Sequence, residues 1–150
     1  KIDYPDASAE QSILRLARGE ALAHKDYDGS KLTEKHLIAA RGQVLQMHMS
    51  EAVEEYLVQL IIATREPGKY GDDLARWVEF GASPRGTIAL DRCARAYAWL
   101  EGRDYVSPDD VRAVAHDVLR HRILLSFEAE ASGLTTDTVI NELLSRVPVA

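Results

Sequence analysis

Residues 50–65 read SEAVEEYLVQLIIATR, and this stretch decides the fold class. Ser50 is a typical helix cap, because its hydroxyl can accept a hydrogen bond from a backbone N–H of the first turn. A mainly apolar stripe follows at intervals of three and four residues, which places its members on one helical face. The stripe consists of Val53, Leu57, Leu60, Ile61 and Thr64. The stretch therefore predicts an amphipathic helix, which ends near residues 66–68, where Pro and Gly stop it.

Two helices are predicted upstream of this stretch. Ser8-Ala9-Glu10-Gln11 has the form of a capping box, and apolar residues at helical spacing continue the helix to about His24. Thr33 can cap a second helix. The later part of this second segment, through Met47 and Met49, could instead be extended.

Three helices are predicted around and after residue 83. Ser83-Pro84 and Ser107-Pro108 each place a capping Ser before a Pro at the first helical position, where the missing N–H costs nothing. The first of these helices ends at Gly102, and a last helix begins at Thr135 or Thr136. For the helix after Ser83 we predict a buried face of Ala89, Cys93, Ala96, Tyr97 and Leu100.

The helical signal is weak in two segments. Residues 69–82 predict a long loop with at most one or two helical turns, and residues 123–127 fit either a helix end or a short strand. At least five helices without a persistent period of two predict an all-α fold, a helical bundle. A short β pairing between the regions of Met47 and Ile123 is compatible with this prediction.

The composition is that of a folded globular protein, with 46% hydrophobic and 28% charged residues. A net charge of −6 repels a phosphate backbone, so we expect no nucleic-acid partner. The single cysteine, Cys93, excludes an internal disulfide and favours a reducing, cytoplasmic location. No apolar run reaches the roughly 18 residues of a membrane span, so we expect no membrane insertion. Because the chain opens at Lys1 without Met, we expect it to be part of a longer polypeptide.

Several short patterns imitate functional motifs but miss essential residues. Residues 63–70 have the frame of a phosphate-binding loop, yet Ala and Tyr replace its first Gly and its final Ser or Thr. Residues 81–85 begin like a nucleophile elbow, but Arg85 replaces the last Gly. Asp26 and Asp28 lack the remaining ligands of a calcium loop, and the five histidines include no pair on one helical face. We therefore predict no metal site and no catalytic residue in this chain.

Arg85 is the sharpest candidate for a binding residue. It falls in the first turn of a well-signalled helix, where the helix dipole already carries about half a positive charge, so a cation there is unfavourable unless an anion lies opposite. A guanidinium group can bind two phosphate oxygens at once. The alternative is a simple ion pair with a nearby acid such as Glu79 or Asp91.

The run GASPRG at residues 81–86 resembles the sensor 2 motif of the MoxR family of AAA+ ATPases. The resemblance extends over nearly the whole chain, because other segments are similar to the family in the same order. They are Tyr4-Pro5 with Glu10 and Ile13-Leu14, Tyr56-Leu57-Val58, Ala63-Thr64-Arg65, Ala94-Arg95-Ala96, residues 102–111, residues 118–123 and Val147-Pro148-Val149.

The resemblance implies that residues 1–150 are the C-terminal lid domain of such an ATPase. Residues 1–5 would be a residual strand or linker from an ATPase core that carries the Walker A and Walker B motifs. The implied role of Arg85 is to reach the γ-phosphate of ATP, with Ser83 and Pro84 shaping the helix start, while Tyr4 and Pro5 flank the adenine. The fragment alone would then not be an enzyme, whereas the intact protein would use ATP and Mg²⁺.

The resemblance also implies partners. The lid would contact its own core and neighbouring subunits of a ring, expected to be a hexamer, which remodels or matures client proteins, often ones with a von Willebrand A domain. The chief alternative is a free-standing helical protein-interaction module, in which Arg85 is an ordinary surface residue. A helix-turn-helix nucleic-acid binder, suggested by Arg112, Arg120, His121 and Arg122, is opposed by the net charge.

Overall fold

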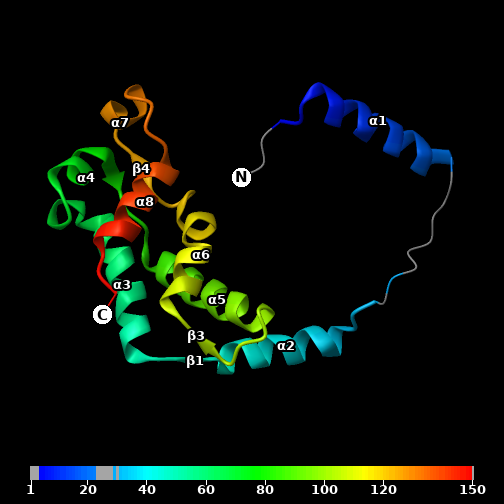
Figure 1. The fold of residues 1–150 in the computed structure, drawn as a ribbon, viewed down its shortest axis with the longest axis horizontal. Coiled ribbons are helices and arrows are strands. Elements are labelled where there is room, and N and C mark those ends of the chain that lie inside the picture. Colours follow the sequence, from blue (N-terminus) through cyan, green and yellow to red (C-terminus); the bar gives the residue numbers. More distant parts are fainter. Residues whose placement is uncertain (1–3, 23–28, 30, 150) are drawn as a thin grey trace. The chain divides into compact units, whose positions relative to one another are not determined.

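The computed structural model describes residues 4–22, 29 and 31–149. The chain divides into two compact units, Lys1–His36 and Leu37–Ala150, and each is described by itself. The described residues form eight α-helices and two short strand pairings (Figure 1). This confirms the predicted all-α class.

The first unit contains helix α1 (Ala7–Leu22). Its cap is Asp6, whose Oδ1 accepts a hydrogen bond of 2.8 Å from the Ala9 N–H. The prediction that Ser8 opens the helix is therefore wrong by two residues, because an acceptor was already available at residue 6. Ser8 lies inside α1, and the predicted end at His24 lies outside the described residues. No residue of α1 is buried, and its large apolar side chains are at least half exposed.

The second unit contains the longer helices that the capping signals predicted. Ser50 caps α3 (Glu51–Arg65) through its side chain, and Ser107 forms a capping box at the start of α6 (Pro108–Leu119). Thr135 caps α8 (Thr136–Arg146). Helix α2 (Glu34–Gln46), at whose start Thr33 accepts a hydrogen bond, begins in the last residues of the first unit and continues in the second. The remaining long helix is α5 (Pro84–Leu100).

The segments with weak helical signals are also ordered. Residues 67–82 form a 3-10 turn (η1, Pro67–Lys69), helix α4 (Asp72–Trp77) and strand β2 (Val78–Phe80). The one or two helical turns predicted here are confirmed as α4, but the rest of the segment is not the predicted long loop, because η1 and β2 flank α4 and the completely buried Leu74 anchors it in the core. Residues 123–127 become the short strand β4 (Leu124–Leu125), followed by helix α7 (Phe127–Ala131).

The strands pair differently from the expected pairing. β1 (His48–Met49) runs parallel to β3 (Tyr105–Val106), while β2 is antiparallel to β4. The Met47 and Ile123 regions therefore do not pair with each other. The turn after α5 brings residues 104–106 to the start of α3, where the His48 N–H donates to the Asp104 carbonyl at 3.3 Å.

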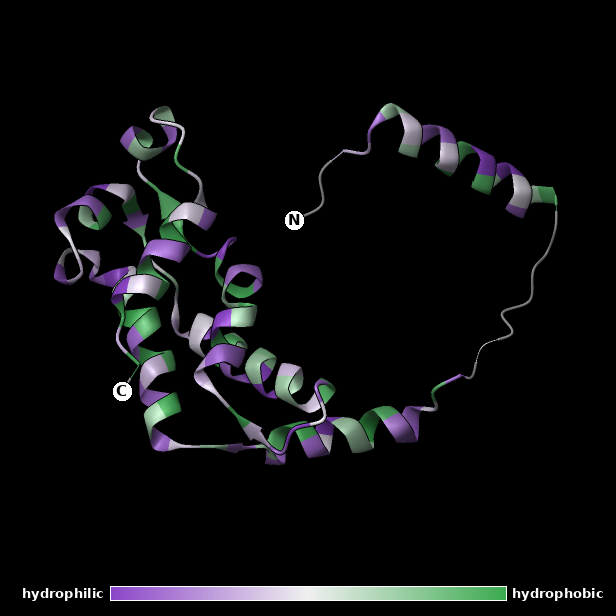
Figure 2. Ribbon diagram, viewed as in Figure 1, coloured by the Kyte–Doolittle hydropathy of each residue, from purple (hydrophilic) through white to green (hydrophobic). Residues whose placement is uncertain are grey.

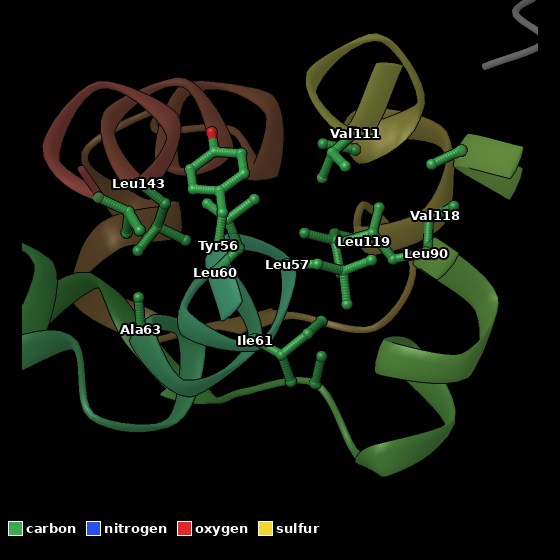
Figure 3. Packing of buried hydrophobic residues seen from close by; sticks show 14 of the residues in the cluster. Tyr56, Leu57, Leu60, Ile61, Ala63, Leu90, Val111, Val118, Leu119 and Leu143 are labelled. Atoms are coloured by element: carbon green, nitrogen blue, oxygen red, sulfur yellow. The ribbon is translucent and has the colours of Figure 1, made fainter. Parts of the chain in front are cut away.

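The core is built around α3. Tyr56, Leu60 and Ile61 are each only 1% exposed, and the predicted stripe on α3 is buried along its whole length. Figure 3 shows these side chains among residues from α5, α6 and α8, including Leu90, Val111, Val118, Leu119 and Leu143. Figure 2 shows the corresponding hydrophobic bands on α3.

The buried face of α5 is not the predicted one. Its buried residues are Gly86, Leu90, Ala94 and Ala98, mostly small side chains that permit the close packing of α5 against α6. Cys93 is exposed, and Leu100 is 73% exposed. Two residues of the predicted face, Ala96 and Leu100, line a hollow of about 380 Å³ together with α2. Both faces of α5 are partly apolar, so helical spacing alone does not identify the inner one.

Candidate functional site

The start of α5 presents Arg85 at the second helical position. Ser83 is extended, with φ −73° and ψ 171°, and Pro84 follows as the first residue of the helix. The Ser83 carbonyl accepts a hydrogen bond of 2.7 Å from the Gly86 N–H. The Ser83 hydroxyl makes no capping hydrogen bond within the described residues, so Ser83 shapes the helix start through its backbone.

The two residues before Ser83 are fastened to the end of α3. The Ala82 N–H donates to Thr64 Oγ1 at 2.9 Å, and Arg65 Nε donates to the Ala82 carbonyl at 2.6 Å. Gly81 lies so close to the Thr64 carbonyl that a methyl group at residue 81 would overlap that oxygen. We call these contacts of Thr64, Arg65, Gly81 and Ala82 the α3 clamp. The clamp fixes the direction in which the first turn of α5 leaves the core.

The α3 clamp depends on a buried hydroxyl, which gives a first prediction. Thr64 is completely buried, and its hydroxyl donates to the Ile61 carbonyl while accepting from Ala82. Thr64→Val keeps the shape but removes the acceptor, and leaving a buried N–H unsatisfied costs about 1–3 kcal/mol. We expect this loss in the free energy of unfolding of the chain, measured by urea denaturation. Thr87→Val, at a hydroxyl with no hydrogen bond inside the described ranges, is the control, and equal losses would contradict the role of Thr64.

Arg85 is exposed, and its guanidinium makes no hydrogen bond or ion pair with any other described residue. The two acids proposed as partners are not paired with it. Asp91 instead accepts from Arg95 Nε at 2.8 Å, and Glu79 forms no ion pair in the part of the chain that the structure describes. The positive charge of Arg85 is thus added to that of the helix N-terminus, and none of the described acids compensates it.

A hollow of about 460 Å³ lies beside Arg85. Its lining consists of Arg85, Ile88, Ala89, Arg92, Cys93 and Arg122. We call it the arginine hollow, because every charged residue in its lining is an arginine. Sequence reasoning did not connect Arg92 and Arg122 with Arg85. Arg92 lies two turns further along the same helix, a spacing that could have indicated a shared face.

The other candidate motifs have structural explanations or fall elsewhere. In the loop-like run 63–70, Ala63 is buried within α3 and Lys69 forms an ion pair with Glu66. Tyr4 and Pro5 belong to the first unit, and Tyr4 is fully exposed. Asp26 and Asp28 lie outside the described residues.

The described residues contain neither a metal-binding cluster nor a membrane-spanning helix. Across residues 4–22, 29 and 31–149, no three His, Cys, Asp or Glu side chains gather as a metal site would require. None of the helices within those ranges has an apolar stretch of the length that crosses a membrane.

Residues 74–143 match the family model described as "AAA lid domain". The chain is 36% identical over 148 residues to the "Chaperone MoxR1" of Mycobacterium tuberculosis, covering 97% of this chain and 38% of that protein. It is 41% identical over 173 residues to the "Protein MoxR" of Methylorubrum extorquens, covering 97% of this chain and 50% of that protein. The chain thus spans half or less of the length of these relatives.

A solved structure has the same fold. It is a putative ATPase from Cytophaga hutchinsonii, which superposes with a TM-score of 0.86 at 34% identity. The superposition covers 99% of this chain and 45% of that one.

Proposed function

Because the chain belongs to the MoxR family of AAA+ ATPases, as a lid domain, we propose that it closes over ATP and senses the γ-phosphate through Arg85. In this proposal an ATPase core elsewhere in the intact protein binds ATP with Mg²⁺ and hydrolyses it. The lid supplies one wall of the nucleotide cleft. It supplies a binding residue and no hydrolytic residue of its own.

The observation that carries the proposal is the unpaired guanidinium of Arg85. A cation in the first turn of α5 is opposed by the helix dipole, and no acid among the described residues offsets it. An exposed guanidinium that is free to form two parallel hydrogen bonds suits a terminal phosphate. The α3 clamp holds the backbone around Arg85 in place, so that little order has to be gained when an anion binds.

Arg85 would act mainly by position and charge. Phosphoryl transfer places negative charge on the oxygens of the transferred phosphate, and a fixed cation beside them lowers the barrier. Once hydrolysis releases the γ-phosphate, Arg85 loses its acceptor and the lid is free to move. The lid therefore reports the nucleotide state by gaining or losing one contact. The resulting movement of the lid would drive the remodelling of client proteins.

The likeness to the MoxR family also suggests which partners the intact protein has. Intact subunits would form a ring, a hexamer, in the cytoplasm, in which each lid contacts its own core and neighbouring subunits. Such a ring would remodel or mature client proteins, including ones with a von Willebrand A domain. The printed name of the M. tuberculosis relative, a chaperone, supports this kind of role. Tyr4 and Pro5 are proposed to flank the adenine.

A direct test compares the 150-residue chain with the intact protein. We expect the chain alone to show no ATP turnover and only feeble nucleotide binding, because it supplies a single wall of the cleft. A phosphate-release assay and equilibrium binding of a fluorescent ATP analogue measure the two properties, with the intact protein as the positive control. Robust hydrolysis by the 150-residue chain would overturn the proposal.

A further inference from the structure

The arginine hollow collects more positive charge than the contact of Arg85 with one phosphate requires. Arg85, Arg92 and Arg122 all line it, and its remaining lining residues carry no acid. The chain as a whole has a net charge of −6, so this cluster of positive charge is opposite in sign to the net charge. Like charges that share a hollow repel one another, and the repulsion disappears when an anion binds between them.

The three arginines reach the hollow from two parts of the fold. Arg85 and Arg92 are seven residues apart on α5, which places them on one face of that helix. Arg122 comes from the segment after α6. Its side chain passes the first turn of α5 at Gly86, where an added Cβ would lie 3.8 Å from Arg122 Cδ.

Arg122 is oriented by one hydrogen bond and keeps donors to spare. Its Nε donates to the Val118 carbonyl at 3.0 Å. Its two terminal nitrogens have no hydrogen-bond partner in the described ranges, and the same holds for the guanidinium of Arg92. The side chain is thus held beside α5 while its terminal N–H groups remain available to a ligand.

We propose that Arg92 and Arg122 are further phosphate-binding residues, so that the arginine hollow takes the polyphosphate chain of the nucleotide and not the γ-phosphate alone. This inference rests on the proposed function. A triphosphate spreads its charge over three adjacent groups, and guanidinium groups from two elements of the fold match that spread. The volume of about 460 Å³ lies within the range of small-molecule sites.

The first test is nucleotide affinity in the intact protein. Arg92→Gln and Arg122→Gln remove charge while keeping a polar side chain. Each should weaken the binding of ATP about ten-fold or more, the usual effect of losing a charge-assisted hydrogen bond, and weaken the binding of AMP much less. Arg76→Gln, at an exposed arginine on α4 outside the hollow, is the matched control and should leave both affinities unchanged.

The variants at Arg85, Arg92 and Arg122 test this inference and the proposed function separately. If Arg85→Gln weakens ATP binding but the variants at Arg92 and Arg122 do not, the inference is wrong and the proposed function stands. If none of the three variants changes ATP binding, the inference is wrong, and the proposed function is also wrong if the Arg85 variant hydrolyses ATP at the wild-type rate. Equal losses for ATP and AMP would also overturn the inference, because they would show an effect on the fold and not on phosphate.

Cys93 supplies a second readout that needs no variant. Its thiol is exposed and lines the arginine hollow, so an occupant should shield it from iodoacetamide. In the intact wild-type protein, ATP and inorganic tripolyphosphate should each slow the alkylation of Cys93, followed by mass spectrometry of its peptide. Unchanged alkylation at saturating ATP would overturn the inference. So would a thiol already protected before any ligand is added, because a protein segment would then fill the hollow.

Discussion

Arg85→Ala in the intact protein is expected to lower the rate of ATP hydrolysis about 100-fold or more, the usual effect of removing one group that stabilises the transition state. In the proposed role, the guanidinium supplies positive charge where the transferred phosphate develops negative charge. The unfolding temperature should stay unchanged, because Arg85 is exposed and makes no hydrogen bond or ion pair with any other described residue. Steady-state kinetics and a thermal melt of the same preparation measure the two effects.

Two further variants make this result specific to the guanidinium. Arg85→Lys keeps the charge but cannot form two parallel hydrogen bonds, so its rate should fall between those of the wild type and Arg85→Ala. Arg76→Ala removes an exposed arginine from α4 and should hydrolyse ATP at the wild-type rate. The sensor role of Arg85 would be refuted by an alanine variant with unchanged hydrolysis and unchanged nucleotide affinity.

Asp110→Ala is expected to cause the largest loss of stability, about 2–4 kcal/mol in the free energy of unfolding, because it removes a buried carboxylate that accepts charge-assisted hydrogen bonds and completes the helix cap. Asp110 is only 1% exposed. Its carboxylate accepts hydrogen bonds of 2.9 Å and 2.6 Å from Arg103, and of 2.8 Å from both the N–H and the hydroxyl of Ser107. The substitution leaves all these donors without a partner. Urea denaturation of the chain at neutral pH measures the loss.

The pH dependence of this loss provides an internal check. Burial favours the neutral form of Asp110, but hydrogen bonds from Arg103 and Ser107 outweigh it, so the pKa lies below its ordinary value of 3.8. A lowered pKa contributes stability that is fully present well above the ordinary value of 3.8 and is lost as the pH falls through the lower pKa of the folded state. The difference between wild type and variant should therefore shrink in acid. Asp109→Ala, at the exposed neighbouring acid, should cost far less, and equal losses for the two variants would contradict the assignment.

The helices could be predicted because their signals are local. A cap such as Ser50 or Thr135 and the apolar stripe behind it lie within a few residues of each other, and the structure confirms both helices. The buried face of α5 could not be predicted in this way. Its inner face is made of small residues whose value depends on how closely α6 approaches, and nothing within α5 itself encodes that approach.

The strand pairings and the candidate site needed the tertiary structure for a similar reason. Strands of two or three residues carry too little periodicity to select a partner, so extended structure near Met49 and at residues 123–127 could be suggested, but the partners of β1 and β4 could not be assigned. The helix start predicted the position of Arg85, because Ser83-Pro84 is a local signal. The approach of Arg122 to Gly86 joins residues 36 positions apart, and no sequence pattern indicated it.

The α3 clamp connects α3 directly to the start of α5. One end of this 15-residue helix is bonded to the backbone just ahead of Arg85, and at 1.5 Å per residue its other end lies about 22 Å away, next to β1. Because α3 is a continuous helix, a displacement of one of its ends is passed on to the other end. If Arg85 binds the γ-phosphate as proposed, a small displacement at that end would reach the opposite end of α3, where β1 leads back to α2.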